Sequence, residues 1–138
     1  MEENMNLVLV NNFRRAVHLT QSSFFVFKGQ GRILSFLRRR GGRIPQKEAL
    51  EITEIKSSSL SEITSKLEAS GYITKETDRS DRRNVVLTLT PSGWERAYYI
   101  QEESRKLGEK AFAVLTEEEK EELHRLLEKL NRYWDETL

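Results

Sequence analysis

The stretch DRSDRRNVVLTLT, from Asp78 to Thr90, places five charged residues within six positions and then alternates apolar residues with threonine. Such alternation is typical of a β-strand with one buried face. The preceding YITKE, residues 72–76, has a similar composition, so the two segments predict a β-hairpin whose connecting loop carries the charges. This loop admits two interpretations: a solvated hairpin tip, or a tip directed at a polyanion.

Helical patterns surround the hairpin on both sides. Apolar residues at helical spacing predict a first helix over 7–27, a second within 32–40, a third within 45–53, a fourth within 54–70, and two more after residue 90. The segment KGQG, residues 28–31, is expected to break the chain between the first two helices. Thr90 is predicted to cap the fifth helix, with Pro91 at its first position. Thr116 and Glu119 are spaced as a capping box for the last helix.

The order helix, strand, helix, helix, strand, loop, strand predicts a winged helix-turn-helix. The expected fold class is therefore mainly α with a small β-hairpin wing, flanked by N- and C-terminal dimerisation helices. One domain in three parts is expected: a dimerisation helix over 1–27, a winged helix-turn-helix DNA-binding region over 28–90, and C-terminal helices over 91–138 that complete the dimer interface. The apolar stripe of the last helix consists of Leu123, Leu126, Leu127, Leu130 and Trp134. Burial of this stripe in a second copy predicts a homodimer, with an intramolecular bundle as the alternative.

The distribution of charge is more informative than the net charge of +1. Residues 28–90 contain thirteen Lys and Arg against eight Asp and Glu, whereas residues 91–138 contain eight against twelve. A basic middle beside an acidic C-terminal third indicates that the middle region contacts an anion.

Signals for catalysis are weak. His18 and His124 are the only histidines, and they fall on separate predicted helices without metal-ligand spacing. There is no cysteine, which excludes disulfides, thiol redox switches and cysteine-ligated metals. No phosphate loop and no nucleophile motif is present. We therefore expect no enzyme activity, no metal site and no cofactor. An acidic N-terminus and the lack of a long apolar segment predict a cytoplasmic protein without a membrane partner.

The fourth predicted helix carries the strongest sign of a nucleic-acid surface. With Leu60, Ile63 and Leu67 turned inward, the opposite face presents small hydroxyl side chains that allow a helix to enter a major groove. Two alternatives stay open here: Ser57 could serve as a helix cap instead, and Glu62 could pair with Lys66 four residues later. The predicted DNA-binding residues are Gln46, Lys47, Lys56, Ser57, Ser58, Ser59, Ser61, Glu62, Ser65, Lys66, Arg79, Arg82 and Arg83.

The hairpin loop contributes the three arginines of that set. An arginine in a wing can enter the minor groove, where the negative potential of a narrow A·T tract is strongest. Asp81 is expected to hold an arginine in place through a bidentate pair. Asp78 and Ser80 fit a solvated loop.

The residues from Asp81 to Thr90 resemble the wing signature of the MarR family of bacterial transcription regulators, D-x-R-x-x-x-L-x-L-T, which appears here as DRRNVVLTLT. The following PSGWERA and the upstream residues 45–76 are similar to the same family. The resemblance implies a triangular homodimer whose terminal helices form the interface and whose two winged lobes bind a pseudo-palindromic operator. It also implies that Arg83 enters the minor groove with Asp81 as its structural partner, and that residues 57–61 begin the recognition helix.

Two departures from the family pattern concern residues before and within that helix. Thr53 and Glu54 stand where the family usually has Leu-Gly, so Glu54 must form the turn without glycine's freedom, or the turn differs. Glu62 occupies a position that is often basic or neutral in the family.

The family resemblance also implies a cleft for a small phenolic or lipophilic effector. Its candidate lining residues are Phe13, His18, Phe24, Phe25, Trp94 and Tyr98, with ordinary core packing as the alternative. The predicted function is thus a sequence-specific transcription regulator, acting as a repressor and released by a small ligand. The alternative is a winged-helix protein–protein interaction module without sequence-specific DNA binding.

Overall fold

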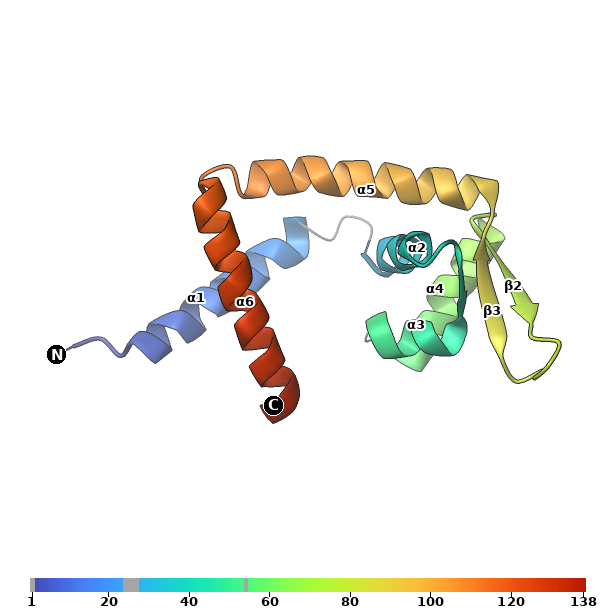
Figure 1. Cartoon of the computed structure of the whole chain (residues 1–138), viewed down its shortest axis with the longest axis horizontal. Coiled ribbons are helices and arrows are strands. Elements are labelled where there is room, and N and C mark those ends of the chain that lie inside the picture. The colour runs from blue at the N-terminus through green and yellow to red at the C-terminus, as the bar shows by residue number, and fades with distance from the viewer. Residues whose placement is uncertain (1, 24–27, 54) are drawn as a thin grey trace. The chain divides into compact units, whose positions relative to one another are not determined.

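The computed structural model describes residues 2–23, 28–53 and 55–138, which form six helices and three strands. In chain order these are α1 (Met5–Ser23), α2 (Lys28–Arg39), β1 (Arg43–Pro45), α3 (Gln46–Thr53), α4 (Ser57–Ala69), β2 (Ile73–Thr77), β3 (Val85–Leu89), α5 (Pro91–Ala111) and α6 (Glu117–Thr137). This order confirms the predicted fold class, a mainly helical chain with a β-hairpin wing (Figure 1). The elements from α2 to β3 are called the winged lobe below.

The chain consists of two compact units, which are Met1–Glu103 and Ser104–Leu138. The first unit contains α1, the winged lobe and the first part of α5, and the second contains the end of α5 and all of α6. The predicted three-part division of the chain by function stays a prediction.

The wing is part of a three-stranded antiparallel sheet with strand order β1-β3-β2. The central strand β3 pairs Leu87 with Ile44 of β1 and with Lys75 of β2. Leu87, Leu89 and Ile73 lie on the buried face, as the alternation predicts. Val86 on the opposite face is also buried, at 7% exposure, so the two faces of β3 differ less than its sequence indicates.

The core of the winged lobe lies between this sheet and its helices (Figure 1). Helix α2 contributes an apolar face, α4 contributes two leucines, and α5 closes the core with two residues. The fully or almost fully buried members are Ile33, Leu34, Phe36, Leu37, Ile44, Ala49, Leu60, Leu67, Ile73, Leu87, Leu89, Ala97 and Ile100. Burying each of the larger side chains contributes about 1.5–3 kcal/mol to stability, which makes this cluster the main driving force for folding of the lobe.

The expected break at KGQG is wrong, because α2 begins at Lys28 and residues 28–31 form its first turn. Gly29 serves packing instead. A Cβ atom on this residue would lie 2.5 Å from Cδ1 of Ile63 on α4. The glycine therefore allows the start of α2 to approach α4 closely. The first helix ends at Ser23 in the structure, and its predicted continuation over residues 24–27 lies outside the described residues.

Thr90 joins three elements of the lobe through one hydroxyl group. Its Oγ1 accepts a hydrogen bond from the amide of Gly93 at 3.0 Å, which confirms the predicted cap of α5. The same hydroxyl donates to the carbonyl oxygen of Gly71, just after α4, at 2.6 Å. Gly93 fits this junction because a Cβ atom there would lie 1.9 Å from the carbonyl oxygen of Tyr72.

The last helix begins at the predicted capping box. The Thr116 hydroxyl accepts from the Glu119 amide at 3.1 Å, and the Glu119 carboxylate accepts from the Thr116 amide at 3.0 Å. None of the residues of α6, all of which are described, is buried within the single chain. Leu123 and Leu126 of its apolar stripe are 36% and 42% exposed.

Replacing Thr90 with valine should lower the free energy of unfolding by about 1–2 kcal/mol, because valine keeps the side-chain shape but removes the cap of α5 and the bond to Gly71. Chemical denaturation monitored by circular dichroism measures this change. Thr90→Ser should retain most of the stability. Thr74→Val, at an exposed position on β2, is the matched control. Equal stability of the two valine variants would contradict the role assigned to the Thr90 hydroxyl.

Candidate nucleic-acid interface

The outward face of α4 has the polar surface that its sequence predicts. Leu60, Thr64 and Leu67 are buried, with Ile63 partly buried beside them. The side chains on the opposite side are exposed: Ser57, Ser58, Ser59, Ser61, Glu62, Ser65 and Lys66. The helix therefore presents mostly hydroxyl groups to solvent.

Capping does not account for these serines. The residue at the N-cap of α4 is Lys56, and it makes no side-chain capping hydrogen bond. Ser57 is the first helical residue, so the cap role considered for it from sequence is wrong.

Glu62 and Lys66 form the ion pair that was one of two alternatives for Glu62. The Lys66 Nζ atom lies 3.2 Å from Oε1 of Glu62, and both side chains are more than half exposed. An exposed pair at this spacing contributes only about 0.3–0.5 kcal/mol. Its consequence is electrostatic: Lys66 offsets the negative charge that Glu62 would otherwise present to a phosphate backbone.

A lysine outside the predicted site set also reaches this face. Lys75 of β2 donates from Nζ to the Ser65 hydroxyl at 3.2 Å, and its backbone amide donates to Oε2 of Glu68 at 3.2 Å. The sequence contains a usable signal for Lys75. It shares the period-2 alternation of Ile73, so it is a charged residue on the strand face that packs toward the helices.

The loop between β2 and β3 is shaped by its aspartates. The Asp78 carboxylate accepts from the amide of Ser80 at 3.0 Å and from its hydroxyl at 2.8 Å. Backbone bonds from Asp78 to Asn84 and from Asn84 to Asp81 close the loop. Both hydrogen bonds are exposed, so Asp78 and Ser80 lie in a solvated loop as expected and also build its turn.

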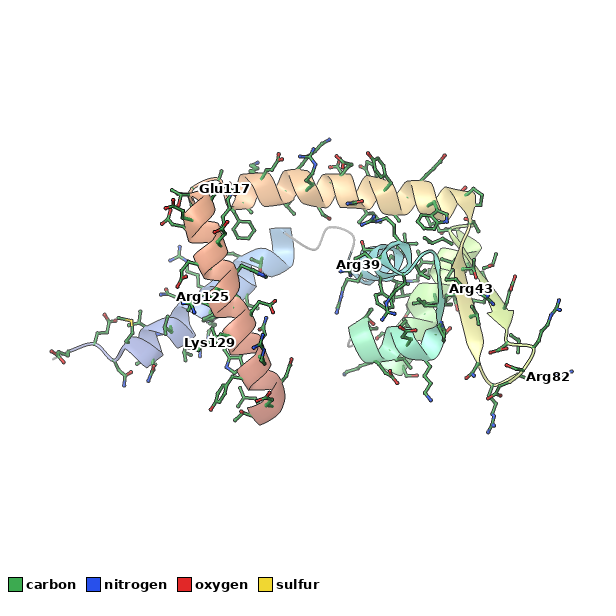
Figure 2. The ribbon with its side chains drawn as sticks, in the orientation of Figure 1. Arg39, Arg43, Arg82, Glu117, Arg125 and Lys129 are labelled. Atoms are coloured by element: carbon green, nitrogen blue, oxygen red, sulfur yellow. The ribbon has the colours of Figure 1, made fainter. Side chains whose placement is uncertain are left out.

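Asp81 contacts Arg83 through a single oxygen. Its Oδ1 accepts from the Arg83 backbone amide at 3.0 Å and from Arg83 Nε at 3.3 Å. The expected bidentate geometry is thus replaced by a bond to the backbone and a bond to the side chain. Asp81 therefore orients the Arg83 side chain through its Nε atom. The same side chain remains 91% exposed, so the guanidinium is free of contacts with the protein core. Figure 2 shows Arg82 at the far end of the same loop, and Arg79 and Arg82 are both exposed.

Helix α3 begins with two residues that were predicted to contact DNA, and these two residues differ in exposure. Lys47 is exposed, whereas Gln46 is half-buried and its Oε1 atom is buried without a hydrogen-bond partner. The amide oxygen of Gln46 therefore faces protein, and Lys47 is the better placed of the two for an external ligand.

The end of α3 is tied to α2. An Arg32 guanidinium nitrogen donates to the backbone carbonyl of Thr53, the last residue of α3. The buried Thr53 hydroxyl donates to the carbonyl oxygen of Ala49 one turn earlier, at 2.5 Å. These two hydrogen bonds accommodate Thr53, one of the two residues that stand where the family usually has Leu-Gly. Glu54, the other position, lies outside the described residues.

The candidate effector cleft is only partly visible. Phe24 and Phe25 lie outside the described residues. Trp94 packs on the Gly42 turn, where a Cβ atom would lie 2.4 Å from the indole ring. Tyr98 is 62% exposed, Phe13 is half-buried and His18 is exposed.

A hollow of about 680 Å³ runs along α6, and none of the described candidate cleft residues, Phe13, His18, Trp94 and Tyr98, lines it. Its lining residues are His124, Arg125, Glu128, Lys129, Arg132, Tyr133 and Glu136. They lie on the side of α6 away from the leucine stripe.

Neither a metal site nor a membrane span is found. Across residues 2–23, 28–53 and 55–138, no group of three or more His, Asp or Glu side chains could hold a metal ion. No helix in the same residues is long and apolar enough to cross a membrane.

The element order, the sheet topology and the exposed recognition helix define a winged helix-turn-helix protein. The sequence model of the MarR family matches residues 28–84, which cover almost the whole winged lobe. Over this region, and in the solved structures below, the chain is similar to the MarR family.

Solved structures share the fold over nearly the whole chain. A MarR protein from Peptoclostridium difficile is 26% identical, with 99% of this chain and 91% of that chain covered and a TM-score of 0.76. The ligand-free organohalide-sensing regulator RdhR-CbdbA1625 is 25% identical, with 95% and 82% covered and a TM-score of 0.78. A mutant MarR from E. coli complexed with operator DNA is 18% identical, with 94% and 99% covered and a TM-score of 0.75. No curated protein sequence matches the chain at a significant level.

Hydrogen bonds from the Ser80 amide and hydroxyl hold the pKa of Asp78 below its ordinary value of 3.8. Because the folded-state pKa is lowered, the contribution of this turn is present above the unfolded pKa and lost as pH falls through the folded one. The Ser80 amide resonance, followed by NMR between about pH 2 and pH 7, should therefore titrate with a midpoint below 3.8. Asp78→Asn should abolish this titration. A midpoint at or above the ordinary value would contradict the hydrogen-bonded turn.

Proposed function

We propose that the protein is a homodimeric, sequence-specific DNA-binding repressor that acts in the cytoplasm on a pseudo-palindromic operator. The observation that carries the proposal is the presence of two exposed surfaces on one winged lobe. These are the serine face of α4 and the loop arginines, of which Arg83 is oriented by Asp81 yet 91% exposed.

The serine face suits a major groove. Hydroxyl groups can donate to or accept from base edges, and their small size lets the helix backbone approach the bases. The loop arginines suit the adjacent minor groove and its flanking phosphates. The proposed contacts in the major groove come from α4, those in the minor groove come from Arg83, and Lys47, Arg79 and Arg82 supply phosphate contacts.

Homodimer formation is supported by the apolar residues that the terminal helices expose. On α1, Leu7, Val10 and Val17 are each at least half exposed. On α6, Leu123 and Leu126 are likewise uncovered within the single chain. Burial of such side chains in a second copy stabilises an assembly by about 1.5–3 kcal/mol for each one fully covered. Two copies related by a two-fold axis would present two recognition helices to an operator of matching symmetry.

Release by a small lipophilic or phenolic effector completes the proposal. RdhR-CbdbA1625 has also been solved in a 2,4-dichlorophenol-bound form, at 24% identity to this chain, and it shares the fold. The exposed Tyr98 and the half-buried Phe13 are the described aromatic residues proposed to contact such a ligand.

Replacing Arg83 with alanine should weaken binding to operator by about 1–3 kcal/mol per site, because the minor-groove contact is lost. The operator is first obtained by selecting bound sequences from a random duplex pool, and affinity is then measured by fluorescence anisotropy. The fold should be unchanged, since the side chain is exposed. Arg132→Ala, an exposed arginine on α6, is the control and should bind as the parent does. An Arg83→Ala protein with parental affinity would remove the wing from the proposed mechanism.

The mass of the protein in solution should be twice the chain mass of 16.2 kDa. Leu126→Glu should reduce it to a single chain, because a carboxylate within the apolar stripe would lose its hydration in the interface. Glu128→Lys, on the opposite side of α6, should remain dimeric. Size-exclusion chromatography with light scattering separates these outcomes. A monomeric parent protein would exclude the proposed dimer.

A further inference from the structure

Lys75 occupies the position where the wing meets the recognition helix. Its pairing with Leu87 places its side chain on the helix-facing side of the sheet, in line with Ile73. Ile73 is fully buried there, whereas Lys75 is only half-buried. The lysine thus lies at the rim of the core, and its ammonium reaches the outer face of α4 at Ser65.

Among the described residues, the ammonium group of Lys75 has one hydrogen-bond partner, and this partner is neutral. Its Nζ donates to the Ser65 hydroxyl at 3.2 Å. Of the neighbouring carboxylates, Glu62 pairs with Lys66, and Glu68 accepts from the backbone amide of Lys75. Within the described part of the chain, no carboxylate forms an ion pair with the Lys75 ammonium, so this cation is not held in a salt bridge.

The contact also orients the hydroxyl group. When the Ser65 oxygen accepts from the ammonium, its own hydrogen remains available for a second acceptor. The ammonium has three N–H bonds and uses one of them on Ser65. Lys75 and Ser65 together therefore offer several donors and a full positive charge at one point of the surface, which is the chemistry that binds a phosphate oxygen.

The geometry of a duplex gives this point a specific ligand. If α4 lies in a major groove and the loop arginine in the adjacent minor groove, one sugar–phosphate strand must pass between them. The junction of α4 with β2 is the part of the lobe that lies between those two surfaces.

We propose that Lys75 and Ser65 form a phosphate-binding pair that clamps the DNA strand separating the two grooves. This inference rests on the proposed DNA-binding function and assigns Lys75 a role that was not expected from the sequence. A phosphate contact positions the protein and carries no base preference. Its loss should weaken binding to specific and random duplexes by the same factor.

The test compares Lys75→Met with Lys75→Arg on the duplex selected from the random pool, with affinity measured across a series of salt concentrations. The parent dimer should show a log–log salt slope of about −5 to −10. Lys75→Met keeps the aliphatic stem but removes one phosphate contact per subunit, so the slope should become shallower by about two units. Lys75→Arg keeps the charge and should retain the parental slope. Lys110→Met, which removes an exposed lysine from the last turn of α5, is the matched control and should leave the slope unchanged.

The outcomes separate this inference from the proposed function. If the parent protein selects no duplex, the proposed function and the phosphate pair fail together. If the parent binds DNA and Lys75→Met retains the parental slope, only the phosphate pair is overturned, even when affinity falls. Such a fall would assign Lys75 a structural role between wing and helix. Thermal unfolding of each variant should give a midpoint close to the parental one.

Discussion

The hydroxyl of Thr90 donates to the carbonyl of Gly71 and accepts from the amide of Gly93, so one side chain joins the end of α4, the end of β3 and the start of α5. The backbone repeats this connection, because the Thr90 amide donates to the carbonyl of Tyr72 at 3.1 Å. Gly93 makes it possible by leaving room for that carbonyl. Helix α4 and the wing are therefore joined at one fixed junction, and the proposed contact with two grooves of one duplex depends on their separation.

The proposed DNA surface combines a nearly neutral helix with a cationic margin. Glu62 and Lys66 offset each other, and the remaining outward residues of α4 are mostly serines. Positive charge lies at the margin instead, in Lys47, Lys75 and the loop arginines. This division matches the two tasks of operator binding, since uncharged hydroxyls can distinguish base edges while cations contact phosphates irrespective of sequence.

Much of the fold and part of the candidate site could be predicted because short-range patterns encode them. The capping box of Thr116, the cap at Thr90 and the strand alternation after Asn84 each depend on residues a few positions apart. Of the three errors, the one at Asp81 is also local, and the other two involve residues far apart in the chain. The prediction that KGQG breaks a helix was wrong because the contact of Gly29 with Ile63 joins residues far apart in the chain, and the local sequence does not show it. Asp81 binds Arg83 through one oxygen because the loop conformation also brings the Arg83 amide within reach. Lys75 was missed because its partner Ser65 lies on another element.

By itself the sequence determined the order of helices and strands, the inward and outward faces of α4, and the concentration of arginines in the wing loop. These follow from periodicity, capping and composition, which act within one or two helical turns. Only the tertiary structure decided which glycines allow close packing and that the Lys75 ammonium contacts Ser65 of α4. Those properties depend on distances between segments that the chain brings together on folding, and no local pattern records them.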